Sequence, residues 1–175
     1  EFQRLTDDII SIAKAARTET QIGFNPLSVS GLSLKIVQEI FEDPAKQNLT
    51  IVGAGQMAIS VIENFYNNGI TKINAVNRSK KILTINDSLS METTPLSQLG
   101  AMIQSTDILV SSINSPLPII GKGLIEQAMK ERKNKPMLLI DLGVPRNVED
   151  QVRDLEYAYL FTIEDIELVT QENLE

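Results

Sequence analysis

The stretch Asn48-Leu-Thr-Ile-Val-Gly-Ala-Gly-Gln-Met-Ala58 decides the predicted fold. Its apolar run, Leu49 to Val52, has the length and composition of a buried strand. Gly53-Ala54-Gly55 ends this run, and a helical pattern begins directly afterwards. This order of strand, glycine turn and helix is typical of the first unit of a parallel α/β sheet.

The glycine loop predicts a dinucleotide site. Gly53 can adopt backbone angles that other residues avoid, Gly55 lets a diphosphate approach the backbone, and Ala58 lets helix and strand pack closely. The helix would direct its free N–H groups and positive dipole end at the anion. The bare pattern is weak, and the alternative is a glycine-rich turn that binds nothing. The strand before it and the helix after it favour a dinucleotide. The predicted diphosphate-binding residues are Gly53, Ala54, Gly55, Gln56, Met57 and Ala58.

Composition limits the chemistry that this chain can perform. It has 175 residues and a formal net charge of -7, with 16 basic and 23 acidic residues. The acidic balance argues against a nucleic-acid grip by this chain alone, because such binding depends on basic patches. The chain contains no cysteine and no histidine. Disulfides, thiolate metal sites and a cysteine nucleophile are therefore excluded within it, and the commonest general base is missing.

The two ends of the sequence have helical patterns, so we expect a fragment of a larger protein. Residues 1–27 would be the end of a preceding catalytic domain or a linker helix, with amphipathic spacing over residues 2–16. Residues 28–165 would form the nucleotide-binding domain, and 166–175 would begin a helix that leads to a further domain. No apolar run has the length of a membrane span, so we expect a cytoplasmic protein without a membrane partner.

The second strand, predicted over Lys72 to Val76, ends at Asn77-Arg78-Ser79. An acidic residue at this point would bind the ribose hydroxyl of NAD, but no Asp or Glu is present. A cation with small hydroxyl and amide donors suits a 2′-phosphate instead. We therefore predict NADP(H), held by Asn77, Arg78 and Ser79. The alternative is that Arg78 is an ordinary solvated loop cation.

Two later strands are predicted to end beside the glycine loop. The strand Asp107 to Ser112 would place Ser111, Ser112 and Ile113 there, with room for the nicotinamide ribose. An ordinary strand-to-loop transition is the alternative for any single serine. The strand Met137 to Asp141 would place Gly143 and Val144 near the nicotinamide ring. Asp141 is interpreted as a carboxylate that caps the neighbouring turn, in preference to an acid/base residue.

The remaining segments give a doubly wound, Rossmann-type, mostly parallel sheet with helices on both faces. A helix follows Ser28 and Ser30, which are candidate N-caps. Residues 82–85 are open between a short strand and the remnant of a helix, and a short helix is expected to end near Ser105. Leu160-Phe161 is predicted as a sixth strand, with Thr162 capping the helix after it.

Taken together, these motifs resemble the NADPH-binding domain of the glutamyl-tRNA reductase family. The resemblance covers most of the chain and is most specific where Ser115-Pro-Leu-Pro-Ile-Ile120 and Asp141-Leu-Gly-Val-Pro-Arg146 follow the glycine loop in this order. Weaker matches are Arg17-Thr-Glu-Thr20, Asn77-Arg78 and Tyr159-Leu-Phe-Thr162. The departures are Ala58 at the last glycine of the pattern and Lys80-Lys81 where the family usually has a helix, which puts the adenine-side contacts in doubt.

The resemblance implies an enzyme that reduces glutamyl-tRNA to glutamate-1-semialdehyde with NADPH, the first step of tetrapyrrole (porphyrin) biosynthesis from glutamate. In that family a cysteine of an N-terminal domain forms a thioester, and a C-terminal domain forms the homodimer. Because this chain has no cysteine, it would contain no catalytic residue and would be inactive alone. Glutamyl-tRNA would be bound mainly by the missing domains.

Two other readings stay open from the sequence. A shikimate/quinate dehydrogenase-like NADP domain shares the glycine loop and the Asn-Arg ending of the second strand, although the stretch Ser115 to Ile120 fits it poorly. A regulatory nucleotide-sensing Rossmann domain is the second alternative. It usually has an acidic residue where Arg78 stands. No metal is predicted.

Overall fold

The computed structural model describes residues 26–166 of the chain. Six strands form one sheet in the order β5-β2-β1-β6-β7-β8, and every pairing in it is parallel. The strands are β1 (Leu49–Val52), β2 (Ile73–Asn77), β5 (Thr94–Pro95), β6 (Ile108–Ser111), β7 (Met137–Asp141) and β8 (Ala158–Thr162). The chain moves outwards from β1 to one edge and then returns to build β6, β7 and β8 on the other side. This is the doubly wound Rossmann-type order.

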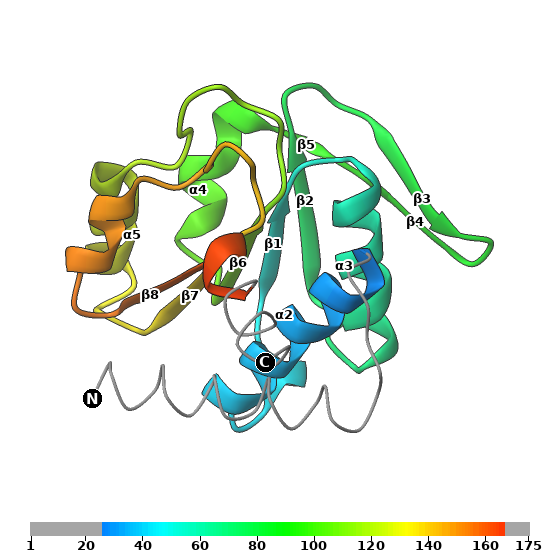
Figure 1. The fold of residues 1–175 in the computed structure, drawn as a ribbon, viewed down its shortest axis with the longest axis horizontal. Helices are drawn as coiled ribbons and strands as arrows, with labels where there is room; N and C mark the ends of the chain where they lie inside the picture. Colours follow the sequence, from blue (N-terminus) through cyan, green and yellow to red (C-terminus); the bar gives the residue numbers. More distant parts are fainter. Residues whose placement is uncertain (1–25, 167–175) are drawn as a thin grey trace, which may run out of the picture.

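Helices cover both faces of the sheet (Figure 1). One face packs against α2 (Pro26–Ile40) and α3 (Gln56–Asn67), and the other packs against α4 (Leu99–Ile103) and α5 (Lys122–Glu131). Short 3-10 helices connect the larger elements: η1 (Pro44–Lys46), η2 (Leu96–Gln98) and η3 (Asp150–Asp154). The predicted α/β fold with helices on both faces is therefore confirmed.

Each face of the sheet has its own hydrophobic core, because successive side chains of a strand point to opposite faces. In β6, Ile108 and Val110 join the core under α2 and α3, and Leu109 joins the core under α4 and α5. Burial on both sides explains why β1, β6 and β7 are continuously apolar over most of their length. The sheet is thus a rigid base from which the loops at its carboxyl edge extend.

A two-stranded antiparallel hairpin replaces a helix between β2 and β5. It consists of β3 (Ile82–Asn86) and β4 (Leu89–Glu92), and it projects beyond α3 at the right of Figure 1. Leu83 and Ile85 anchor it in the core beside α3, while Ile82 is 70% exposed. Residues 82–85 are thus a strand.

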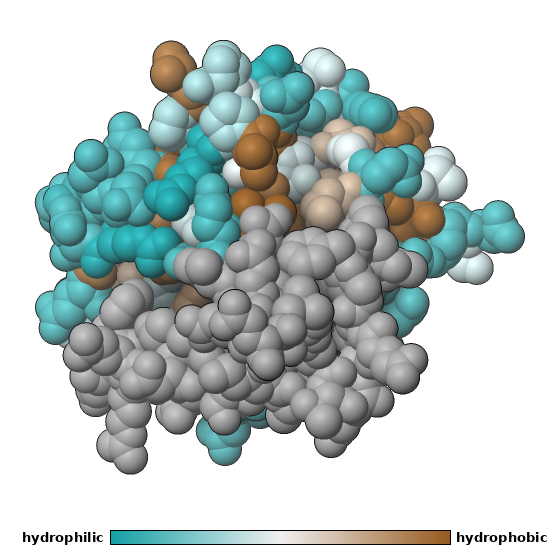
Figure 2. All heavy atoms as spheres, viewed as in Figure 1, coloured by the Kyte–Doolittle hydropathy of each residue, from teal (hydrophilic) through white to brown (hydrophobic). Residues whose placement is uncertain are grey.

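In the same view, hydrophilic residues cover the region around α5, and hydrophobic ones appear mainly near the centre and towards the hairpin (Figure 2).

Local hydrogen bonds fix the end of α3 and the start of the helix after β8. The helix after the glycine loop ends at Asn67, where Gly69 adopts a φ of 92° and donates its N–H to Tyr66 O at 3.1 Å. After β8, the Thr162 N–H donates to Asp165 Oδ2 at 2.8 Å, and the Asp165 N–H donates back to Thr162 Oγ1 at 3.3 Å. This reciprocal pair is a capping box, so Thr162 caps the following turn as predicted.

The predicted start of the second helix is wrong. Ser28 and Ser30 lie inside α2, which already includes Pro26, so neither serine is its N-cap. The physical reason is that proline is well tolerated in the first turn of a helix, where its missing N–H would have had no partner. The predictions for residues 2–16 and for the helix after 166 lie outside the described residues.

Candidate functional site

The predicted site residues meet at the carboxyl edge of the sheet. The parallel registers place Val52 of β1 level with Val76 of β2 and with Ser111 of β6, and Ser111 level with Asp141 of β7. The loops that follow these four strands therefore lie in a row. The ends of β1 and β6, where the strand order reverses, form the topological switch point at which ligands bind in doubly wound sheets.

Position 53 requires a glycine because of its backbone conformation and because neighbouring atoms lie close to it. Its φ is +134°, and a Cβ atom built on it would lie 2.4 Å from the Ser112 carbonyl oxygen. Its N–H donates to Val76 O at 2.8 Å, which continues the ladder between β1 and β2. Gly53 thus closes the first loop against the end of β6, and the sequence interpretation of this glycine is confirmed for its backbone angle.

Gly55 has a different environment. It is the N-cap of α3, in an extended conformation, and a Cβ atom built on it would meet nothing within 4 Å. Gly55 and Gln56 are exposed, whereas Ala58 is fully buried in the core. The first turn of α3 contains no acidic residue. The open space in front of Gly55 therefore lies at the positive end of a helix whose first N–H groups lack intrahelical partners.

Arg78 extends from the end of β2 towards the segment after β6. Its Nη2 donates to the Asn114 carbonyl oxygen at 2.8 Å, and its side chain is exposed. Asn77 Nδ2 donates to Ser79 O at 3.3 Å. Within residues 26–166, Arg78 forms no ion pair, whereas the nearby Lys80 pairs with Glu92 at 2.9 Å. The guanidinium is therefore a cation without a carboxylate partner in the described chain.

The two serines at the end of β6 have unequal roles. Ser111 is fully buried, and its hydroxyl donates to Asn147 Oδ1 at 2.8 Å. Ser112 is half-buried, and its N–H donates to Val52 O at 2.8 Å. Ile113 is nearly buried, and its N–H donates to Asn147 Oδ1 at 2.9 Å. Of these predicted contacts, Ser112 lies directly against the glycine loop, and Ser111 faces the protein interior.

Asp141 caps the turn after β7, as the sequence interpretation favoured. Its carboxylate accepts the N–H groups of Gly143, Asn147 and Val148 at 2.9, 2.7 and 2.8 Å. Burial raises the pKa of Asp141, and these three hydrogen bonds oppose that rise. Since the carboxylate is fully buried and its partners are backbone amides, its role is to shape the turn rather than to exchange protons with a substrate.

Gly143 and Val144 occupy that turn in contrasting ways. A Cβ atom built on Gly143 would lie 2.4 Å from the Asn147 side chain, so the space left by the glycine is filled by Asn147. The sequence interpretation reserved this space for a nicotinamide ring. Val144 is 71% exposed beyond the turn and precedes a cis peptide bond to Pro145. Val144 is therefore the residue of this pair that presents its side chain at the edge of the sheet.

Asn147 is the residue that the sequence analysis missed. It is fully buried and connects the ends of β6 and β7 through its side chain. The available signal was an amide directly after Asp141-Leu-Gly-Val-Pro-Arg146, where a polar side chain follows a turn. Its partners at the end of β6 lie 34 to 36 positions earlier in the chain, so no local pattern reveals them.

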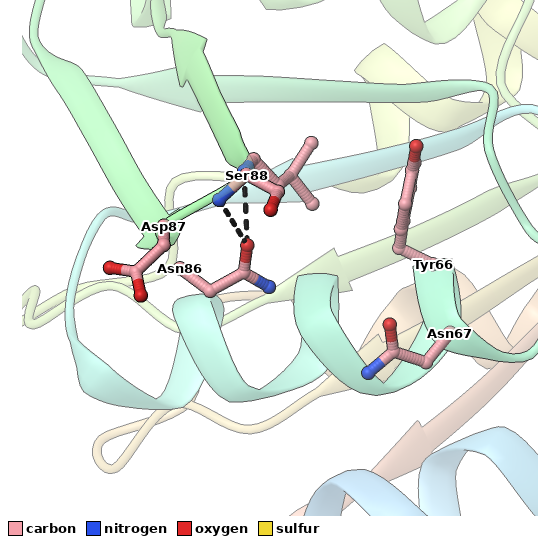
Figure 3. Close-up of a pocket in the computed structure, with 6 residues that line it drawn as sticks. Tyr66, Asn67, Asn86, Asp87 and Ser88 are labelled. Atoms are coloured by element: carbon pink, nitrogen blue, oxygen red, sulfur yellow. Dashed lines mark hydrogen bonds between the residues drawn. The ribbon is translucent and has the colours of Figure 1, made fainter.

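A separate cavity of about 410 Å³ lies at the other end of α3, towards the tip of the hairpin (Figure 3). Tyr66 and Asn67 line it from the helix, and Asn86, Asp87 and Ser88 line it from the hairpin. The Asn86 Oδ1 accepts the N–H groups of Ser88 and Leu89, both at 3.0 Å, and so holds the hairpin turn. None of the predicted cofactor residues lines this cavity.

Two features are absent from the part of the chain that the structure describes. No helix within residues 26–166 is long and apolar enough to cross a membrane. The same residues contain no group of three or more His, Cys, Asp or Glu side chains that could hold a metal ion.

Comparison with known proteins then places this geometry in a family. The family model for shikimate / quinate 5-dehydrogenase matches residues 35–169. The chain belongs to this family. The matched range contains the whole sheet and every predicted cofactor residue, and it leaves out the start of α2.

Relatives that match the whole chain include glutamyl-tRNA reductases. Glutamyl-tRNA reductase from Pseudoalteromonas atlantica is 39% identical over 100% of this chain, which spans 42% of that relative's length. Among solved structures, glutamyl-tRNA reductase from Methanopyrus kandleri is 26% identical with a TM-score of 0.71, covering 92% of this chain and 41% of that one. The resemblance stated from the sequence is therefore confirmed.

A further solved structure supports the fold alone. The nucleotide-binding domain of glutamyl-tRNA reductase from Thermoplasma volcanium has a TM-score of 0.51 at 17% identity. The alignment covers 87% of this chain and 96% of that one. The two chains therefore share a fold over nearly all of that domain's length.

Proposed function

We propose that this chain is the NADPH-binding domain of a glutamyl-tRNA reductase. The observation that carries the proposal is the open space at Gly55, in front of the α3 N-terminus, in a chain that aligns over its full length with that family. Arg78, at the end of the adjacent strand, adds a cation that has no carboxylate partner within residues 26–166. These features fit a dinucleotide with a 2′-phosphate.

In this proposal, different residues of the carboxyl edge bind different parts of the cofactor. The loop Gly53 to Ala58 holds the diphosphate, because the helix N–H groups and dipole face the open space there. Asn77, Arg78 and Ser79 hold the 2′-phosphate. Ser112, Ile113 and Val144 line the ribose and nicotinamide end, and Ser111 and Gly143 support them from the interior.

The bound cofactor supplies a hydride for reduction of the glutamyl group to an aldehyde. This chain's contribution is placement, because hydride and acyl carbon must be brought together and oriented before reaction. The chain has no cysteine, so the nucleophile that carries the glutamyl group belongs to a different part of the protein. The 175-residue chain should therefore bind NADPH without reducing glutamyl-tRNA.

The proposal also covers the larger protein. We assign residues 28–165 to the cofactor domain, 1–27 to the end of a preceding domain, and 166–175 to the start of a helix towards a dimerisation domain. Glutamyl-tRNA would be bound mainly by those other domains, since this chain carries a net charge of -7. The enzyme would be a cytoplasmic homodimer in porphyrin biosynthesis.

The matched family description supports a second candidate, a shikimate or quinate dehydrogenase. It would use the same cofactor residues with a different substrate domain. The whole-chain similarity to glutamyl-tRNA reductases favours the first proposal.

The two candidates are separated by assaying the full-length protein with each substrate. With glutamyl-tRNA and NADPH we expect glutamate-1-semialdehyde, and with shikimate or quinate and NADP+ we expect no reduction of the cofactor. Oxidation of shikimate or quinate, without any semialdehyde from charged tRNA, would overturn the proposed function. Uncharged tRNA with NADPH is the control for non-specific cofactor oxidation.

A further inference from the structure

Asn147 has a side chain whose hydrogen-bonding groups are all used inside the protein. Its Oδ1 accepts the Ser111 hydroxyl at 2.8 Å and the Ile113 N–H at 2.9 Å. Its Nδ2 donates to the Ile113 carbonyl at 2.9 Å and to the Pro145 carbonyl at 3.4 Å. The Asn147 side chain thus holds Ile113 by both its N–H and its carbonyl, in the manner of a neighbouring strand.

The backbone of Asn147 is fixed equally well. Its N–H donates to the buried Asp141 carboxylate at 2.7 Å. Its carbonyl accepts the N–H groups of Ile119 and Ile120 at 2.8 and 3.0 Å. One fully buried residue therefore connects the end of β6, the turn after β7 and the segment that leads into α5.

The turn is built around this amide. The nearest atoms to a Cβ atom on Gly143 would be Asn147 Cγ and Oδ1, both at 2.4 Å, and Nδ2 at 2.6 Å. Any side chain at position 143 would displace the amide from its partners. Gly143 and Asn147 thus form one unit, in which the glycine provides the space and the asparagine provides the contacts.

We propose that Asn147 is the positioning residue for the nicotinamide end of the site. It is buried and does not itself reach a ligand. It acts by holding Ile113 and the Gly143–Pro145 turn, from which Val144 extends. The inference rests on the proposed function, because it assigns this end of the carboxyl edge to the nicotinamide. Among the described residues, none of the Asn147 hydrogen bonds involves the glycine loop or Arg78, which contact the segment after β6 at Ser112 and Asn114 instead.

Two ligands separate the two ends of the site. NADPH occupies both, whereas adenosine 2′,5′-bisphosphate has the adenine, ribose and 2′-phosphate but no nicotinamide. We expect N147A to weaken NADPH binding about tenfold or more, since buried partners of the amide are left unsatisfied. Its affinity for the bisphosphate should change less than twofold. The readout is the affinity ratio, defined as the affinity for NADPH divided by the affinity for the bisphosphate. A general loss of folded protein would lower both affinities together and leave this ratio unchanged.

A milder pair of variants covers the case in which N147A does not fold. S111A removes one hydrogen bond to Asn147 Oδ1, and T106V removes a buried hydroxyl pair, Thr50–Thr106 at 2.7 Å, ahead of the same strand. Both positions are buried, but only Ser111 is connected to Asn147. We expect S111A to lower the affinity ratio about threefold or more. T106V should leave it unchanged.

A double variant tests the unit formed by the two residues. G143A alone should lower the affinity ratio as N147A does, because the new methyl group displaces the amide. G143A/N147A should be no worse than N147A, since the methyl group then enters vacated space. Equal losses of both ligands in folded N147A or S111A would overturn the inference and leave the proposed function intact. A wild-type chain that binds neither ligand would overturn the proposed function, and the inference with it.

Discussion

At the residue scale, two glycines two positions apart have different physical reasons for being glycine. Gly53 has a positive φ and lies against the Ser112 carbonyl, so it serves the fold. Gly55 has an extended backbone and open space around it, so its side-chain position is free for a ligand. A pair of alanine substitutions should separate these two roles.

We predict that G53A destabilises the chain by at least about 2 kcal/mol, from backbone strain and overpacking. G55A should lower the free energy of unfolding by no more than about 1 kcal/mol, which is the typical cost of alanine at an N-cap. It should nevertheless weaken NADPH binding about tenfold or more, because the methyl group would occupy the diphosphate position. Urea denaturation and ligand titration measure the two effects. A G55A variant that binds NADPH like the wild type would contradict the placement of the diphosphate.

Arg78 is the residue that we predict to select NADPH over NADH. We predict that R78A lowers NADPH affinity roughly ten- to hundredfold and leaves NADH affinity nearly unchanged, since charge-assisted hydrogen bonds to a 2′-phosphate would be lost. K81A, a neighbouring exposed lysine, is the matched control for a general loss of positive charge. Equal effects of R78A on both cofactors would remove the 2′-phosphate from this position.

At the scale of elements, a buried ion pair fixes the start of β6 to the end of α5. Asp107 Oδ1 accepts Arg132 Nη2 at 2.9 Å and Lys135 Nζ at 2.8 Å, and Asp107 Oδ2 accepts the Asn48 N–H at 3.0 Å. The Asp107 and Arg132 side chains are 2% and 3% exposed. Burial opposes ionisation of Asp107, but Lys135, the Asn48 amide and Arg132 together lower its pKa.

We predict that D107N lowers the free energy of unfolding by about 3–5 kcal/mol at pH 7, because it leaves the Arg132 charge uncompensated in the interior. A lowered pKa in the folded state stabilises the fold above the unfolded-state value of about 3.9, and this contribution is lost as pH falls through the folded-state value. The difference between wild type and D107N should therefore shrink below about pH 4. Urea denaturation between pH 7 and pH 3 measures it.

The matched control is E126Q, which breaks an exposed pair with Lys130 at 3.5 Å on the same helix. It should cost no more than about 1 kcal/mol at any of these pH values. A D107N variant as stable as E126Q at pH 7 would show that the buried pair does not hold β6 to α5.

The same scale shows what local sequence can predict. Buried strands such as β1 and β7 are apolar runs bounded by turn residues, so their positions follow from composition alone. The sequence leaves residues 82–85 open between a strand and a helix. The reason is that β3 buries only Leu83 and Ile85, and this alternation is too short to distinguish the two. The prediction of Ser28 or Ser30 as the N-cap is wrong, because Pro26 is compatible with the first turn of α2 and the helix therefore begins before either serine. Asn147 and the Asp107–Arg132 pair depend on contacts between distant segments, which no periodic pattern encodes.

At the scale of the whole molecule, the carboxyl edge of the sheet combines segments that are far apart in the chain. The glycine loop, Arg78, Ile113 and Val144 come from four different strand ends, and the strand order brings them into one row. Under the proposed function this row of loops binds the cofactor, and the chain contributes no cysteine or histidine side chain to the reaction.

The central claim is that this edge binds NADPH, and titration of the 175-residue chain with NADPH and NADH at one ionic strength tests it most directly. We predict saturable binding of NADPH with a dissociation constant at least about tenfold lower than that of NADH, as expected for a charge-assisted contact to the 2′-phosphate. Failure to bind either cofactor would contradict the account. Equal affinity for both would contradict the selection of NADPH by Arg78.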